Sequence, residues 1–245
     1  MANRTVTLEI LRTDIENQAD FVGATQRYTD PITTRWINQS IQRFRERLSL
    51  EGSTHYLVSV AKSLTSGATS PYPFQVLDLS AESPSLVRTF GVDITLPGGI
   101  IRTLSHTPFT ERCSYGGPSV TGIPIAWAHY QTRKIAILPP PNQALTAVVW
   151  YLPVVADLSA DGDTFDGVSG WEDFIVWDVV VRHMTRDRDG DGYQMATAYR
   201  AETWNDIVRN ATKVTSAGGA HIGRDSMGAR GGGGYYARKG RLPPP

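Results

Sequence analysis

The sequence contains a single cysteine, no excess charge of either sign and no long apolar run. Cys113 is the only cysteine among 245 residues, which excludes an internal disulfide framework and a zinc site built from several thiolates. The 24 basic residues balance 24 acidic ones, which argues against a chain that coats DNA along its whole surface. The longest apolar stretch, residues 144–156, has about 13 residues, whereas a transmembrane helix needs about 20. We therefore expect a soluble protein with no membrane partner.

Signals for secretion and for common enzymes are also missing. The first residues lack the apolar run of a signal peptide, so we expect synthesis in the cytoplasm. The sequence contains neither a P-loop nor a Gly-x-Gly-x-x-Gly motif after a strand, and residues 117–122 are one residue too long for a nucleophile elbow. Cys113 lacks the surroundings of a reactive thiol. We expect a protein that is not an enzyme and that uses no cofactor.

The first stretch, residues 1–53, predicts two helices. Leu8, Leu11, Ile15 and Ala19 recur at helical spacing and share one face. Asp30 and Pro31 suit the N-cap and first position of a second helix, and Gly52 suits its end. The apolar stripe of that helix is Ile37, Ile41, Phe44 and Leu48. Its arginines, Arg35, Arg43, Arg45 and Arg47, are expected to be solvated, with an interface between subunits as the alternative.

The second stretch, residues 54–153, loses the helical period and predicts a small antiparallel β domain. Short runs of branched and aromatic residues are separated by Pro and Gly, and residues 145–151 alternate between two strand faces. The three prolines 139–141 cannot continue a central strand and mark a turn. The expected strands are Phe74–Leu79, Leu86–Val92, Gly99–Leu104, Lys134–Leu138 and Leu145–Tyr151.

The third stretch, residues 154–213, returns to helix. Ser169 and Glu172 fit a capping box before a run, Phe174–Met184, that is apolar nearly all round and predicts a buried helix. A last helix follows the polar break 186–192. The predicted fold is therefore α+β: a four-helix bundle made of two N-terminal and two C-terminal helices, with the β domain inserted and an extended C-terminal tail.

The tail, residues 214–245, contains nine of the 23 glycines and five basic residues against one acidic residue. With few large apolar side chains it cannot bury enough surface to offset its ordering entropy, so we expect it to be disordered alone. Fully extended it would span roughly 100 Å. It could be simply solvated, bind nucleic acid or order on a protein partner. The candidate partner-binding residues are Arg224, Arg230, Tyr235, Tyr236, Arg238, Lys239 and Arg241.

A possible metal site lies at Asp187, Asp189 and Asp191, followed by Gly192, which matches the start of an EF-hand calcium loop. The loop would need a bidentate Glu at its last position, where this chain has Ala198. We therefore favour an Asp/Gly-rich turn between two helices and expect no metal. A calcium-dependent binding module stays as an alternative function, as does a nucleic-acid-binding protein that uses the tail.

The order of elements resembles the phage head–tail adaptor, or connector, family. The N-terminal resemblance rests on residues 11–22 and on Trp36-Ile-Asn-Gln-Ser-Ile41, which fits a helix, a short link and a second helix. Residues 124–131, 135–141 and 148–153 resemble the paired strands of that family, and residues 171–177 its third helix. The resemblance covers about residues 5–213.

This resemblance implies a structural virion protein in the neck, between head and tail, assembled in the host cytoplasm. It implies a ring of about twelve copies below the portal that continues the DNA channel, docks tail or nozzle proteins and clasps the portal through its C-terminal segment. Double-stranded DNA would pass without sequence-specific binding. Without the tail the chain has 19 basic and 23 acidic residues, and this net charge of −4 agrees with such a channel.

Overall fold

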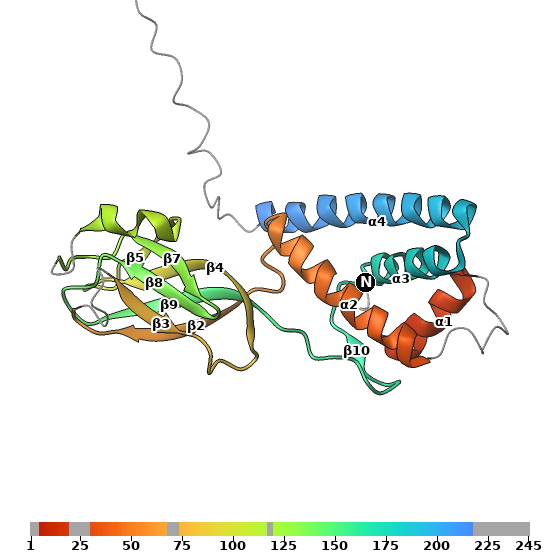
Figure 1. Cartoon of the computed structure of the whole chain (residues 1–245), viewed down its shortest axis with the longest axis horizontal. Helices are drawn as coiled ribbons and strands as arrows, with labels where there is room; N and C mark the ends of the chain where they lie inside the picture. Colours follow the sequence, from red (N-terminus) through yellow and green to blue (C-terminus); the bar gives the residue numbers. More distant parts are fainter. Residues whose placement is uncertain (1–4, 20–29, 68–73, 117–119, 218–245) are drawn as a thin grey trace, which may run out of the picture.

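The molecule is an elongated α+β structure whose α-helices gather at one end and whose two four-stranded sheets gather at the other (Figure 1). This computed structural model describes residues 5–19, 30–67, 74–116 and 120–217. We call the four α-helices with strands β1 and β10 the helical part, and the remaining strands with helix η1 the β part. The chain passes from the helical part into the β part after α2 and returns after β9.

The helical part consists of two helices from each end of the described chain. Their bounds are α1 Leu8–Gln18, α2 Asp30–Leu50, α3 Glu172–Asp187 and α4 Gly190–Ala217. Thr7 caps α1, since its Oγ1 accepts a 3.3 Å hydrogen bond from the Ile10 amide. Asp30 is the first helical residue of α2 and not the residue before it. Gly52 ends α2 with a φ of +90°, as predicted.

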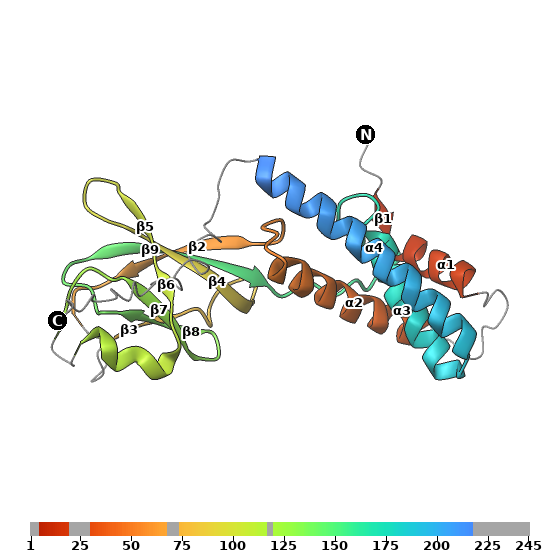
Figure 2. The same cartoon turned by 90° about the horizontal axis from the view of Figure 1, so that it is seen from above.

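α3 lies at the centre of the helical core. α1, α2 and α4 all pack against it, and α4 covers one side of it (Figures 1 and 2). The buried core residues of α3 include Phe174, Ile175 and Val179, which confirms the predicted buried helix. The α+β class is thus confirmed, whereas the description of these helices as a regular four-helix bundle stays a prediction.

Two helix boundaries differ from the expected ones. Ser169 does not cap α3: the N-cap is Trp171, because the chain turns at Gly170 with a φ of +95°. Glu172 still reaches back, and its Oε2 accepts a 2.6 Å bond from the Gly170 amide. At the other end, α4 continues to Ala217, so residues 214–217 of the expected tail are helical.

The β part contains two four-stranded sheets, ordered β2–β9–β4–β5 and β3–β8–β7–β6. The bounds are β2 Val58–Leu64, β3 Gln75–Asp78, β4 Leu86–Thr95, β5 Ile101–Thr103, β6 Ser105–His106, β7 Ala126–Gln131, β8 Lys134–Leu138 and β9 Leu145–Pro153. All pairs are antiparallel except β6–β7, which is parallel and corrects the purely antiparallel prediction. The two sheets share one core, to which Ile94, Val149 and Ile137 contribute.

β8 is buried on both faces because a 3-10 helix, η1 (Phe109–Tyr115), covers the outer side of its sheet. Ile135 and Ile137 face the core between the sheets, while Ala136 and Leu138 belong to a second cluster that contains Phe74. The predicted alternation of β9 is confirmed, since its residues from Leu145 to Tyr151 are alternately buried and more accessible. The predicted proline turn lies between β8 and β9.

A small sheet ties the start of α1 to the segment that returns from the β part. β1 (Val6–Thr7) pairs with β10 (Thr164–Phe165), with Val6 opposite Phe165. The Leu8 amide also donates a 2.9 Å bond to the Asp163 carbonyl. Both strands lay inside stretches that the sequence assigns to other structure, so neither was expected.

Candidate interaction surfaces

The three aspartates of the possible calcium loop belong to a helix–turn–helix connection. Asp187 ends α3, and Asp191 lies in the first turn of α4. Asp189 caps α4, because its Oδ1 accepts a 3.1 Å bond from the Gly192 amide. Over the residues that the structure describes, no group of three or more acidic, histidine or cysteine side chains is placed to hold a metal ion. These aspartates therefore support the predicted turn.

The seven candidate partner-binding residues of the tail lie between positions 224 and 241. All of them are outside the described residues, so their role stays a prediction. The part of the expected tail that the structure does describe is the end of α4.

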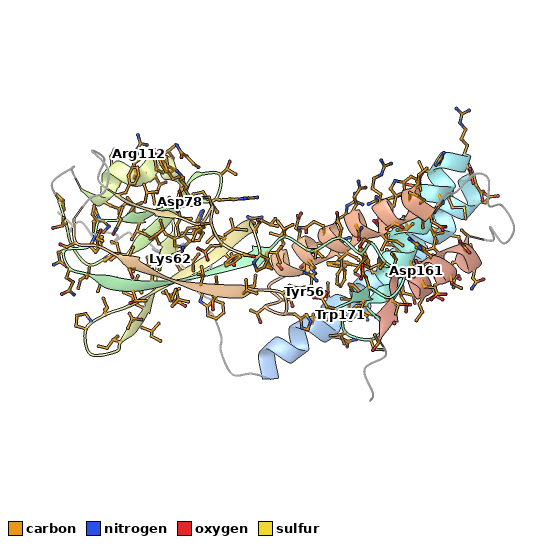
Figure 3. All side chains as sticks on the ribbon, turned by 90° about the horizontal axis from the view of Figure 1, so that it is seen from below. Tyr56, Lys62, Asp78, Arg112, Asp161 and Trp171 are labelled. Atoms are coloured by element: carbon orange, nitrogen blue, oxygen red, sulfur yellow. The ribbon has the colours of Figure 1, made fainter. Side chains whose placement is uncertain are left out.

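An aromatic cluster lies where the chain passes from α2 to β2. The Trp171 ring lies 4.9 Å from the His55 ring and 6.1 Å from the Tyr56 ring, centroid to centroid. Figure 3 shows Tyr56 and Trp171 close together where α2 meets the sheets. The Arg45 guanidinium lies 4.5 Å from the centroid of the Tyr56 ring and forms an ion pair with Asp166. Burial raises the pKa of the Tyr56 phenol. The cluster is thus a packed contact between the end of α2 and the start of α3.

A buried carboxylate organises the surface where α2, α3 and α4 meet. Asp178 of α3 is 1% exposed and accepts a 2.8 Å bond from Ser40 Oγ. Three guanidiniums surround it: Arg43 and Arg182 approach Oδ2 at 3.2 Å, and Arg200 approaches Oδ1 at 2.9 Å. Burial alone would raise the pKa of Asp178, but the Ser40 bond and the arginine charges outweigh it, so the pKa is lowered.

Four arginines of this surface, Arg43, Arg47, Arg182 and Arg200, form what we call the arginine face. Arg47 stacks over the Trp204 ring at 4.1 Å, and burial together with the charge of Arg200 lowers its pKa. The three arginines around Asp178 leave a local excess of two positive charges. The α2 arginines were expected to be solvated, which is wrong for Arg45, since only 9% of that residue is exposed.

The opposite flank of α2 faces residues 154–166, which we call the acidic segment. Its acidic residues are Asp157, Asp161, Asp163 and Asp166. Asp161 forms a 2.6 Å ion pair with Arg12, and bonds from the Ser159 and Ala160 amides lower the pKa of Asp163. Asn38 holds the segment on α2 through two 3.0 Å bonds to Leu158. A groove of about 900 Å³ runs between α2 and this segment.

The β part exposes several large apolar side chains. Ile100 and Ile101, at the tip of the β4–β5 hairpin, are 63% and 70% exposed. The hairpin projects from the sheet in Figure 2. Trp150 of β9 is 40% exposed, and its Nε1 donates a 2.7 Å bond to Asp93. Aromatic and branched side chains held rigidly at a surface are typical of contact sites for other proteins.

The histidines and the single cysteine of the β part do not form a metal-binding cluster within the described residues. His106 and His129 lie 5.5 Å apart beside Trp127, and burial with the charge of His106 lowers the pKa of His129. Cys113 is exposed on η1. Within the described ranges, each helix is too short or too polar to span a lipid bilayer.

One comparison with known proteins identifies the chain. A family model described as SU10 adaptor protein matches residues 7–223, which extends from β1 to six residues past the end of α4. No curated protein matches the chain. The match thus covers almost all of the described fold, helical part and β part together. The chain belongs to the SU10 adaptor protein family, a phage head–tail adaptor family.

Proposed function

We propose that this protein is a head–tail adaptor whose copies form a ring of about twelve between the portal and the tail of a phage. The ring lies in the neck of the virion, is assembled in the host cytoplasm and continues the DNA channel. The observation that carries this proposal is the family match over residues 7–223. The structural role as a phage adaptor follows from the family. We propose the ring, the portal contact and the channel in addition.

Charged surfaces on the helical part and apolar ones on the β part support different contacts for the two parts in such a ring. A cyclic assembly needs two different faces on each copy, and the helical part has an arginine face and an acidic segment on opposite flanks of α2. The β part instead offers the exposed Ile100 and Ile101 hairpin and Trp150. We infer that the helical part forms the ring and that the β part docks tail or nozzle proteins.

The acidic excess outside the tail supports a role in DNA passage. Residues 1–213 carry 19 basic and 23 acidic side chains, a net charge of −4. A channel wall of that sign repels phosphate, so double-stranded DNA would pass without being held.

The portal contact is assigned to the tail. The five basic residues and two tyrosines that we expect to bind the portal all follow position 223, where the family match ends. We therefore place the portal clasp in a segment outside the stretch that the family model matches.

The experiment that tests the proposal mixes the purified full chain with purified portal rings. A truncation after Gly223 removes the seven candidate residues and keeps the matched region. A second variant keeps the length but replaces Arg224, Arg230, Arg238, Lys239 and Arg241 with Ser. Native mass spectrometry should show rings of the full chain on the portal and much weaker binding of both variants. Equal binding by all three chains would contradict the portal clasp, and no binding by the full chain would contradict the adaptor role.

A further inference from the structure

The two flanks of α2 contact different parts of the molecule. Arg43 points toward α3 and α4, where it pairs with Asp178. Asn38 points toward the acidic segment, where it bonds with Leu158. Five residues separate these positions, which on a helix places their side chains about 140° apart. The two charged surfaces of the helical part therefore lie on opposite flanks of the same helix.

The arginine face is rich in positive charge and partly accessible. The Arg43 side chain is 57% exposed and that of Arg200 is 30% exposed, although both also contact Asp178. Close by on α3 and α4, Trp177 and Tyr199 form a stacked pair with ring centroids 4.8 Å apart. Arginine with tyrosine and tryptophan is the composition that dominates the energetic centres of protein interfaces.

The acidic segment has the opposite charge and is more accessible. Two of its four aspartates, Asp161 and Asp166, form ion pairs with Arg12 and Arg45, which leaves an excess of two negative charges. The carboxylates of Asp161 and Asp166 are 67% and 58% exposed. Figure 1 shows α4 along one edge of the helical part and β10 at the other edge, and Figure 3, viewed from the side opposite α4, shows Asp161.

We propose that the arginine face of one copy docks on the acidic segment of a second copy, as the repeated contact of the ring. This inference rests on the proposed ring. The two surfaces match in charge, arise from one chain and lie on opposite flanks of α2, which is what a head-to-tail contact requires. Guanidinium forks pair well with carboxylates, and complementary charge sets the register of docking.

The second copy of the chain is favoured over DNA as the occupant. The acidic segment supplies carboxylates of matching charge on every copy of the chain, and Asp178 already neutralises part of the positive charge that a run of phosphates would need. A carboxylate partner could share the outer guanidinium nitrogens while Asp178 keeps its own contacts. Binding of DNA by this face is therefore a competing outcome that the experiment below separates.

The test is a charge exchange in the full chain. R43E and D157R should each raise the protein concentration needed for assembly by about tenfold, because each places like charges across the contact. The double variant R43E/D157R restores opposite charges between neighbouring copies and should recover assembly. R102E makes the same charge change on exposed β5, in the β part, and should assemble like the unmodified chain. Sedimentation at low salt, at increasing protein concentration, gives the readout.

Two further measurements distinguish loss of this contact from misfolding of the variants. R43Q removes the charge but keeps a donor for Asp178, so it should weaken assembly while thermal unfolding stays near that of the unmodified chain. A C113S chain with cysteines at positions 43 and 157 should form a ladder of oligomers with a short bis-maleimide, whereas either cysteine alone should give no ladder.

The outcomes distinguish this contact from the ring itself. If R43E and D157R both assemble like the unmodified chain, the proposed contact is wrong, whereas the proposed ring is not contradicted. A full chain that stays monomeric, with no cross-linked ladder, would overturn the contact as well, while binding of the portal as a ring would still support the adaptor. Loss of double-stranded DNA binding in R43Q with unchanged assembly would assign the face to DNA instead.

Discussion

Asp178 brings together side chains from three helices, a role that sequence patterns do not reveal. In the sequence it interrupts an apolar run that predicts a buried helix, and that helix is confirmed. Its partners Ser40, Arg43 and Arg200 come from two other helices, far away in the chain. Only Arg182 is at helical spacing from it. Helical periodicity can therefore place the residue on α3, but it cannot gather the cluster.

Replacing Asp178 with Asn should lower the free energy of unfolding by about 3 kcal/mol. Removing one partner of a buried ion pair leaves the others uncompensated, and three guanidiniums would then face each other around a neutral side chain. Urea unfolding followed by circular dichroism measures the change. The matched control is D206N, which breaks the exposed pair with Arg209 and should cost less than about 1 kcal/mol. Equal effects of the two variants would contradict the structural role of Asp178.

His183 should make the fold less stable in mild acid. It is 1% exposed in the helical core, and burial lowers its pKa to about 4. Between the unfolded pKa of about 6.5 and this value, the unfolded chain binds a proton that the folded chain does not. Stability should therefore fall as pH drops through that window, by up to about 1.4 kcal/mol per pH unit. Urea unfolding of H183L across pH 4 to 6.5 should show a flatter slope, and an unchanged slope would count against this effect.

At the level of elements, local sequence signals correctly predicted helix ends and strands that depend on neighbouring residues. Gly52 ends α2 where a left-handed residue is needed, and alternation placed β9. The capping box at Ser169 failed because the turn at Gly170 makes Trp171 the N-cap. β1 and β10 could not be predicted, since two-residue strands have no period, and their pairing joins segments far apart in the sequence.

The β1–β10 pair allows a matched test at two glycines. At Gly167 a methyl group would collide with the Phe165 ring, which is itself packed against Phe44. At Gly162 it would meet nothing within 4 Å. G167A should therefore destabilise the protein by about 1–3 kcal/mol, whereas G162A should be neutral or stabilise it by about 0.5 kcal/mol. Chemical denaturation of the two variants gives the comparison, and a neutral G167A would show that the ring can move aside freely.

On the scale of the whole molecule, the change of period at residue 54 and its return after residue 153 indicated the order of helices and strands. It could not indicate that His55 and Tyr56 pack on Trp171, because Trp171 lies far from them in the sequence. Nor could composition show the charges of the helical part separating onto two flanks of α2. The zero net charge hides this polarity, since the arginine face and the acidic segment cancel in the sum.

Separate cores in the helical part and the β part predict that the two unfold with different stabilities. Ile175 belongs to the helical core and Ile94 to the core between the sheets, and both are fully buried. I175A and I94A should each cost about 2–5 kcal/mol, but only in the part that contains the substitution, because the two cores have no residue in common. Hydrogen exchange measured by mass spectrometry should show α3 opening more readily in I175A while β8 is unchanged, with the reverse in I94A. Equal loosening of both parts by either variant would mean one cooperative unit. Independent stability is what an adaptor needs if its β part is to engage the tail while its helices hold a ring.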